Sequence, residues 1–502
     1  MPRKVAEQTP AASSSGQSDA RLVAKNMAYL AAGQVLTIPV SVILNALYAR
    51  YLGAVDFGLI YLAVTMCSFG TLVVEWGQQS VLPALIARDR SQATTLLGTG
   101  FAWRGVAACV VYLFLAALSL LLGYGRLFQW VLALVFLGAL ITSLAGGYKD
   151  SIRGFERTDI PAIAHVAQQF LLLLAVLAVL LLGGRLNGML YVGVLVPLAT
   201  LLGLSYASKR VGIGSLRVRR ESLGILFAMG VPFVFNDIAT VLQPVVDAMF
   251  LSRLAPAETV GWYAASRRLV GILILPTTTL IGGLYPTLCR LWAENKEVFA
   301  RTTRDALSGI ALLAAPAALG CGLFPEIGVA VFGEKGFGPA EGNLRVMAVF
   351  VFLIYFTIPI GTAVLAAGKQ RAWSIIQVLC VVVSVVLDPV LVPWFQTRTG
   401  NGGIGLSVAS VISESLVVIG GIALVPRGVL DRSVLRTIAL TLLSGAAMAA
   451  VAFALKGRIT PFVAAPLALL TYAGAALVSG AITKSQRDAV LGILRRRLGR
   501  FL

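Results

Sequence analysis

The feature that most constrains this chain is a series of fourteen apolar segments, each about 20 residues or longer, separated by short polar stretches. About 20 helical residues cross the hydrocarbon core of a bilayer, where every backbone N–H and C=O must be hydrogen-bonded internally. Only 13% of the residues are charged and the mean hydropathy is +0.88, which excludes an ordinary soluble domain. We therefore expect an all-α polytopic membrane protein with about fourteen transmembrane helices.

The apolar segments divide into two sets of six and a final pair. We expect two pseudo-repeated six-helix lobes, a basic linker between them and two additional helices, with polar tails at both ends. The N-terminal tail is expected to be disordered, and the basic C-terminal tail is expected to form an amphipathic helix at the membrane surface. The predicted parts are 1–20 (tail), 21–207 (first lobe), 208–221 (linker), 222–426 (second lobe), 427–483 (additional helices) and 484–502 (tail).

An internal repeat supports the two-lobe division. Arg50 and Gly58 recur as Arg253 and Gly261, a constant shift of 203 residues. In both copies the pattern predicts a helix that ends near an arginine, a short turn with an acid near the next helix start, and a glycine that opens that helix. The chain therefore resembles two related halves, although arginines and acids between helices are common in membrane proteins.

The basic residues fix the expected orientation. The formal net charge is +19, and 29 of the 41 Lys and Arg residues fall on the side that carries the termini, against 8 on the other side. This distribution is the positive-inside pattern and not a nucleic-acid-binding face, so both termini are expected in the cytoplasm. The five cysteines are scattered and predict neither a disulfide framework nor a metal site.

Motifs for catalysis are missing from the sequence. There is no phosphate-binding P-loop, no nucleophile elbow and no cluster with metal-ligand spacing, and the single histidine, His165, stands alone in an apolar segment. We therefore expect a protein that is not an enzyme and has no cofactor. Energy for transport would come from an ion gradient, the membrane potential or a substrate gradient.

Polar stripes run along the first helix of each lobe. Asn45 lies on such a stripe in the first helix, and Asn236, Asp237, Gln243 and Asp247 lie at helical spacing in the seventh. Ionisable groups inside a membrane usually face a cavity, which favours a transport path, although hydrogen bonding between helices is the alternative. The two acids on this stripe are candidates for ion coupling.

Further charges interrupt other apolar segments. Arg104 lies within the third segment, and Arg267 and Arg268 lie within the eighth. Guanidinium groups bind phosphate in a bidentate manner, so these arginines predict a phosphate-bearing substrate, with internal salt bridges as the alternative. Asp388 and Glu414 in the eleventh and twelfth segments are additional ion-coupling candidates.

Together these features resemble the polysaccharide and oligosaccharide flippases of the multidrug/oligosaccharidyl-lipid/polysaccharide exporter superfamily. The resemblance covers about residues 20 to 480. It is carried by short motifs in a fixed order: Lys25-Asn26, the stretch 49–58, Tyr285-Pro286, the loop 332–340, the stretch 368–376 and the stretch 402–414.

The resemblance implies two six-helix lobes around a central cavity that opens alternately to either side of the bacterial inner membrane. The implied substrate is a polyprenyl-pyrophosphate-linked oligosaccharide for exopolysaccharide, capsule or O-antigen synthesis. The expected partners are this lipid, membrane lipids and a polysaccharide polymerase or co-polymerase. In this reading Arg267, Arg268 and Arg104 would hold the pyrophosphate, while Asn45, Asn236 and Gln243 would contact sugars.

Several alternatives stay open at this point. A peptidoglycan-precursor flippase would share the phosphate chemistry, whereas the arginines disfavour a drug/cation antiporter of the same superfamily. An integral-membrane polymerase or ligase would be expected to carry a long external catalytic loop, which the sequence lacks. A non-transporting scaffold for a polysaccharide machine is the remaining possibility.

Overall fold

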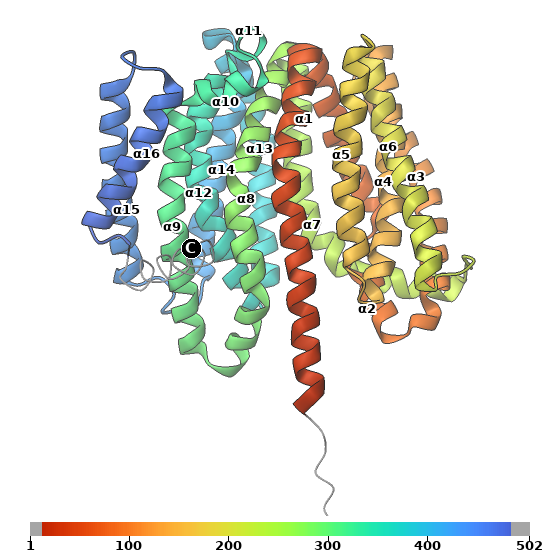
Figure 1. Cartoon of the computed structure of the whole chain (residues 1–502). Coiled ribbons are helices and arrows are strands. Elements are labelled where there is room, and N and C mark those ends of the chain that lie inside the picture. The colour runs from red at the N-terminus through yellow and green to blue at the C-terminus, as the bar shows by residue number, and fades with distance from the viewer. Residues whose placement is uncertain (1–12, 483–502) are drawn as a thin grey trace, which may run out of the picture. The chain divides into compact units, whose positions relative to one another are not determined.

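The computed structural model describes residues 13–482, and within this range the regular structure is helical. Figure 1 shows the helices running roughly parallel or antiparallel within each part of the chain. Their bounds are α1 Ser13–Glu75, α2 Gln78–Arg88, a 3-10 turn η1 Arg90–Gln92, α3 Ala93–Leu121, α4 Arg126–Gly154, α5 Asp159–Leu181, α6 Leu186–Val211, α7 Arg220–Leu254, α8 Ala257–Glu294, α9 Lys296–Leu323, α10 Pro325–Phe332, α11 Glu334–Phe337, α12 Ala340–Ala366, α13 Gln370–Thr399, α14 Gly402–Leu424, α15 Arg432–Leu455 and α16 Pro461–Val478.

Twelve stretches of the described chain are long and apolar enough to cross a membrane. One of them, Leu36–Arg88, bends at Gly53 and so contains two arms of opposite direction. The helix α7, with 35 residues, is long enough for a further span. This is consistent with the fourteen predicted helices, and the chain is a multi-pass membrane protein.

The bend in α1 replaces the turn expected between the first two spans. Gly53 has φ 75° and ψ 177°, a conformation that residues with a Cβ rarely adopt, and the helix resumes directly after it. Asp56, the acid of the first repeat copy for which the pattern predicted a turn, is therefore already helical. In the second repeat the corresponding break falls at Pro256, between α7 and α8 and 203 residues further on.

The tails differ in how far the structure describes them. Residues 13–20, expected to be disordered, are helical at the start of α1, because a polar segment can simply extend the long helix that follows it. Residues 1–12 and the predicted amphipathic tail 484–502 lie outside the described residues.

The chain forms two compact units that exchange one segment. Unit 1 comprises residues up to Leu44 and Gly70–Val234, whereas unit 2 comprises Asn45–Phe69 and all residues from Phe235 onward. The bend of α1 thus belongs to unit 2, although residues 45–69 lie within the segment predicted as the first lobe, 21–207. Helix α7 also changes unit part-way along its length.

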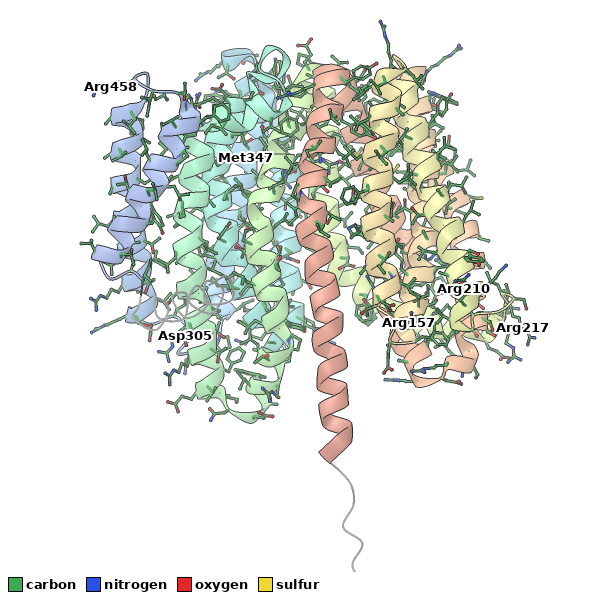
Figure 2. The ribbon with its side chains drawn as sticks, viewed as in Figure 1. Arg157, Arg210, Arg217, Asp305, Met347 and Arg458 are labelled. Carbon is green, nitrogen blue, oxygen red and sulfur yellow. The ribbon has the colours of Figure 1, made fainter. Side chains whose placement is uncertain are left out.

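Unit 1 is built on α2 to α6. Its main buried cluster brings Val81, Leu97 and Ile152 together from α2, α3 and α4. The linker after α6 packs along α3, where the backbone N–H of Arg219 donates to Thr99 Oγ1 at 3.0 Å and that of Arg217 donates to the Thr94 carbonyl at 3.2 Å. Figure 2 shows Arg157, Arg210 and Arg217 at the same end of this unit, as the charge pattern predicts.

Unit 2 packs α8, α9, α12, α13 and α14 around a large apolar core that includes Ala314 and Met347. The helices α15 and α16 form a hairpin beside α9 (Figure 1), and the Tyr472 hydroxyl of α16 donates to the Leu312 carbonyl of α9 at 2.8 Å. The additional helix pair is therefore an integral part of this unit.

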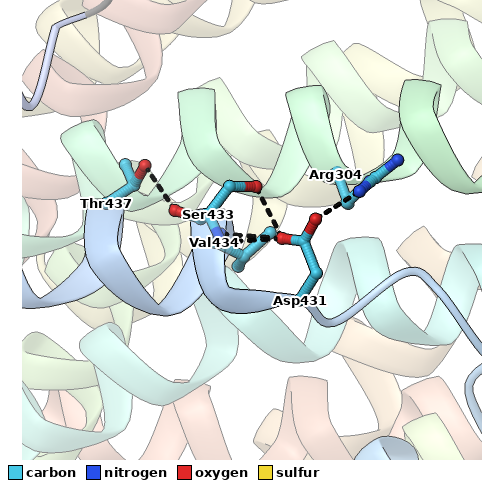
Figure 3. A network of polar contacts seen from close by, with 5 residues as sticks. All are labelled: Arg304, Asp431, Ser433, Val434 and Thr437. Carbon is cyan, nitrogen blue, oxygen red and sulfur yellow. Dashed lines mark hydrogen bonds and ion pairs between the residues drawn. The ribbon is translucent and has the colours of Figure 1, made fainter.

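A charged cap fixes the start of α15, and Figure 3 shows it together with its neighbours. Asp431 Oδ1 accepts hydrogen bonds from the backbone N–H of Ser433 at 2.9 Å and of Val434 at 3.1 Å, while Oδ2 pairs with Arg304 of α9. These bonds satisfy free N–H groups at the helix start. The bonds from Ser433, together with Arg304, hold the pKa of Asp431 below its usual value.

Candidate functional site

The most unusual chemistry in unit 2 is a pair of buried carboxylates. Asp247 on α7 and Asp388 on α13 are 3% and 0% exposed, and their carboxyl groups interact electrostatically with one another. Neither oxygen of Asp388, nor Oδ1 of Asp247, meets a donor among the described residues. Two ionised carboxylates repel strongly in a dry interior, so the pair requires a shared proton or a bound cation.

Neutral oxygen atoms surround this carboxylate pair. Gln243 lies one helical turn before Asp247, and Ser384 lies one turn before Asp388, so both face the same region. Gln243 Nε2 donates to Ser384 Oγ at 3.3 Å, and Ser384 Oγ lies 3.2 Å from Ser413 Oγ of α14. Carboxylate, hydroxyl and amide oxygens are suitable ligands for hard cations, and they can equally relay a proton.

Arg267 brings a positive charge to the same region. It is half-buried on α8, its guanidinium lies 5.4 Å from the centre of the Phe350 ring, and it interacts electrostatically with Asp247. It also interacts electrostatically with Tyr61. Arg268 is exposed and interacts electrostatically with Tyr61. The two adjacent arginines therefore face different surroundings.

Glu414 extends the cluster onto α14. It is half-buried and interacts electrostatically with Arg267, while its Oε1 lacks a partner among the described residues. The structure thus unites Arg267, Gln243, Asp247, Asp388 and Glu414, which the sequence presented as separate candidates. We call these five residues the unit 2 charge cluster.

The remaining candidates in unit 2 lie on the two helices that carried the polar stripes. Asn45 and Asp237 are half-buried, and each interacts with a neighbouring group. Asn236 is part of α7, but its side chain lies outside the described ones.

Arg104 has an entirely different environment, in unit 1. It is 1% exposed, its Nε donates to Gln78 Oε1 at 3.1 Å, and its Nη1 donates to the Ser143 carbonyl. Gly147 leaves the space that this side chain fills, because a Cβ there would lie 3.0 Å from Arg104 Nη1. The guanidinium is therefore enclosed by α3, α4 and the start of α2, away from any surface that a substrate could contact.

Sequence reasoning missed the neutral members of the site. Ser384, Ser413 and Tyr61 complete the surroundings of the charges, but single serines and tyrosines are common in transmembrane helices. A signal was present, since Ser384 precedes Asp388 by four residues and Ser413 adjoins Glu414. Both polar pairs stand in otherwise apolar helices.

Comparison with known proteins then identifies the family. The model of the polysaccharide biosynthesis protein family matches residues 23–292, more than half of the chain. The chain belongs to this family. A second model, that of the MatE family, matches residues 232–390. Both matches place this polysaccharide biosynthesis protein within the superfamily expected from its motifs.

Solved structures show the same fold at low identity. A lipid II flippase, MurJ, in an inward closed conformation is 12% identical, with a TM-score of 0.70 over 92% of this chain and 99% of the flippase. An inward-facing multidrug resistance MATE transporter is 15% identical, with a TM-score of 0.63 over 77% of this chain and 92% of the transporter. These neighbours are transporters and flippases, not enzymes. No curated protein sequence gives a significant match.

Proposed function

We propose that the protein is a flippase that moves a polyprenyl-pyrophosphate-linked oligosaccharide across the bacterial inner membrane by alternating access. Its family membership and its flippase-like fold support transport as the function. The observation that carries the proposal is the unit 2 charge cluster, where an arginine stands beside buried carboxylates that lack donors. Charges in a membrane are costly, and such groups mark substrate and ion pathways.

Arg267 is the proposed anchor for the pyrophosphate, with Arg268 as a second contact. A guanidinium forms two parallel hydrogen bonds with a phosphate. Arg267 interacts with Asp247 and Tyr61, and the phosphate is proposed to replace these interactions. Asn45, Asn236 and Gln243 are proposed to contact sugar hydroxyls. We do not extend a substrate role to Arg104, because its guanidinium is enclosed in unit 1.

Asp247 and Asp388 form the proposed coupling site, with Glu414 and Asp237 as neighbouring acids. A proton or a monovalent cation that enters between the two carboxylates removes their repulsion and changes the charge next to Arg267. Binding of the ion and of the anionic substrate would then depend on one another, and this dependence must be reciprocal. The termini are proposed to face the cytoplasm, where a polymerase or co-polymerase would be neighbouring machinery on the synthetic route.

The test is reconstitution of the purified protein into liposomes, followed by the appearance of a lipid-linked oligosaccharide in the opposite leaflet. The variant is Arg267→Ala with Arg268→Ala, and the matched control is Arg432→Ala with Arg436→Ala, two exposed arginines on α15. We expect the control to translocate like the wild type and the variant to fail. If no sugar lipid moves under any imposed ion gradient, the flippase proposal is wrong.

A peptidoglycan-precursor flippase is the second candidate, because the lipid II flippase shares the fold over almost the whole chain. Its substrate carries a peptide as well as a pyrophosphate. Faster translocation of a lipid-linked muropeptide than of peptide-free oligosaccharides, in the same liposomes, would favour this candidate. The opposite preference would favour the first.

A further inference from the structure

Two repeat-related backbones touch within unit 2. A Cβ on Gly58 would lie 2.7 Å from the backbone N of Gly261, and one on Gly261 would collide with the Ala54 carbonyl. Only glycine allows this approach of α1 to the start of α8, because any larger side chain would separate the two backbones. The two glycines are the same residues that the 203-residue shift relates in sequence. The contact therefore joins equivalent positions of the two predicted repeat copies.

The last turn of α10 is hydrogen-bonded to the bend of α1. Arg50 Nε donates to the Val331 carbonyl at 3.0 Å, and its Nη2 donates to the Ala330 carbonyl at 2.7 Å. These carbonyls lie in the last turn of α10, where they have no partner within the helix, and a cation there is also favoured by the helix dipole. Gly333, at φ 106°, ends α10 directly after the bonded carbonyls and turns the chain into α11.

Three aromatic rings fill the space behind this arginine. Phe57 of α1 lies 6.0 Å from Phe332 and 5.8 Å from Phe337, measured between ring centres, and the latter two rings lie 6.0 Å apart. All three side chains are at most 6% exposed. The two contacts of Phe57 are edge-to-face and the third is tilted, and together the buried rings pack the junction.

The same segment also holds α8. The Trp262 indole N–H donates to the Gly336 carbonyl at 2.9 Å, one residue after the glycine contact with α1. Carbonyls of residues 325–337 therefore accept hydrogen bonds from side chains of both helices that meet at Gly58 and Gly261. Cavities of about 520 Å³ and 360 Å³ flank the junction, the first lined by Arg50 and Gly333 and the second by Ala54 and Trp262.

We propose that residues 325–337 form a strap that locks one end of unit 2, and that Arg50 is its release point. The inference rests on the proposed alternating access, which requires each end of the transport path to open in turn. Opening at this end must separate Gly58 from Gly261, and the strap bridges these two backbones. Because the Arg50 side chain is exposed, water can replace the hydrogen bonds that it donates. Water cannot replace the aromatic contacts behind them. Release of the strap therefore begins with loss of the Arg50 hydrogen bonds and ends with separation of the three aromatic rings.

The test measures exposure of the junction and does not depend on transport. The five native cysteines are replaced by alanine, and Ala49→Cys provides one thiol at a position that is 0% exposed in the closed strap. In lipid nanodiscs, the rate of labelling with a hydrophilic maleimide reports how often the strap opens. We expect Arg50→Gln to raise this rate by about tenfold, because a charged donor that serves two carbonyls is lost.

Trp262→Phe keeps an aromatic side chain, though a smaller one, and removes the indole N–H, and we expect a smaller rise of about threefold because the hydrogen bond that is lost is neutral. Arg185→Gln removes an exposed arginine from unit 1 and serves as the charge-matched control, with no change expected. Retained elution volume and unfolding temperature would show that each variant is folded.

Equal labelling of Arg50→Gln and its parent would overturn the strap, as would an equal rise in Arg185→Gln. Because the labelling needs no substrate, faster labelling in a protein that moves no lipid would leave the strap standing and refute only the flippase.

Discussion

Two arginines within apolar helices of this protein, the buried Arg104 in unit 1 and the half-buried Arg267 in unit 2, differ in what surrounds them. Arg104 donates to a neutral amide oxygen and a backbone carbonyl in a space shaped by glycine. Arg267 lies over an aromatic ring next to carboxylates that lack donors. On the proposed function, the comparison suggests a criterion: the arginine beside unsatisfied carboxylates is the one expected to contact substrate. Arg104, whose hydrogen bonds are made to acceptors already in place and which also interacts electrostatically with Asp150 and Glu75, is expected to serve the packing of helices.

The largest effect should come from Arg267→Ala, in which we expect translocation to fall about a hundredfold. The phosphate would lose its bidentate partner, while Asp247 and Asp388 can still share a proton and preserve the packing. Initial translocation rates per folded protein would measure this loss. A rate within threefold of the wild type would show that Arg267 does not hold substrate.

Arg104→Ala should lower stability and leave translocation nearly unchanged, the opposite of Arg267→Ala. We expect a loss of about 3 kcal/mol in the free energy of unfolding, because Gln78 and the Ser143 carbonyl lose their donor and a cavity is left. Denaturation in mixed micelles would measure the change, with translocation of the remaining folded protein near the wild-type rate. A stable variant that cannot translocate would reverse the comparison and place Arg104 in the transport path.

Asp388→Asn should reduce the dependence of translocation on the imposed ion gradient by about tenfold. The amide can donate to Asp247, so the pair no longer requires a proton or a cation. Translocation would be followed under proton and sodium gradients separately. Unchanged dependence on both gradients would exclude this pair as the coupling site.

The smallest effect is expected outside the membrane-spanning helices, at Asp431. Loss of this cap in Asp431→Ala should cost about 1 kcal/mol of stability at neutral pH. Since folding lowers the pKa of Asp431, its contribution is present above the ordinary pKa of an aspartate and is lost as the pH falls through the folded value. Unfolding temperatures of the two proteins should therefore converge in acid, and a constant difference down to the lowest pH would contradict this assignment.

The sequence predicted the helices more fully than the site. Long apolar segments can only be helices in a bilayer, so their number and order followed directly, and the glycine at the first turn became the bend of α1. The sequence could not distinguish Arg104 from Arg267, because each is an arginine inside an apolar segment. Only the tertiary structure distinguishes them. Gln78 and Ser143 accept hydrogen bonds from Arg104, whereas Asp247 interacts with Arg267.

The exchange of residues 45–69 into unit 2 has a consequence for biosynthesis. Phe57 is synthesised 275 residues before Phe332, the ring against which it finally packs. During that interval the bend of α1 is already made, but its aromatic and glycine contacts do not yet exist. Segments that are made early and wait for distant partners leave apolar surface unpaired in the meantime, and such surface favours misassembly. The closed end of unit 2 is thus among the last parts of the protein to form, although its first segment is among the earliest to be made.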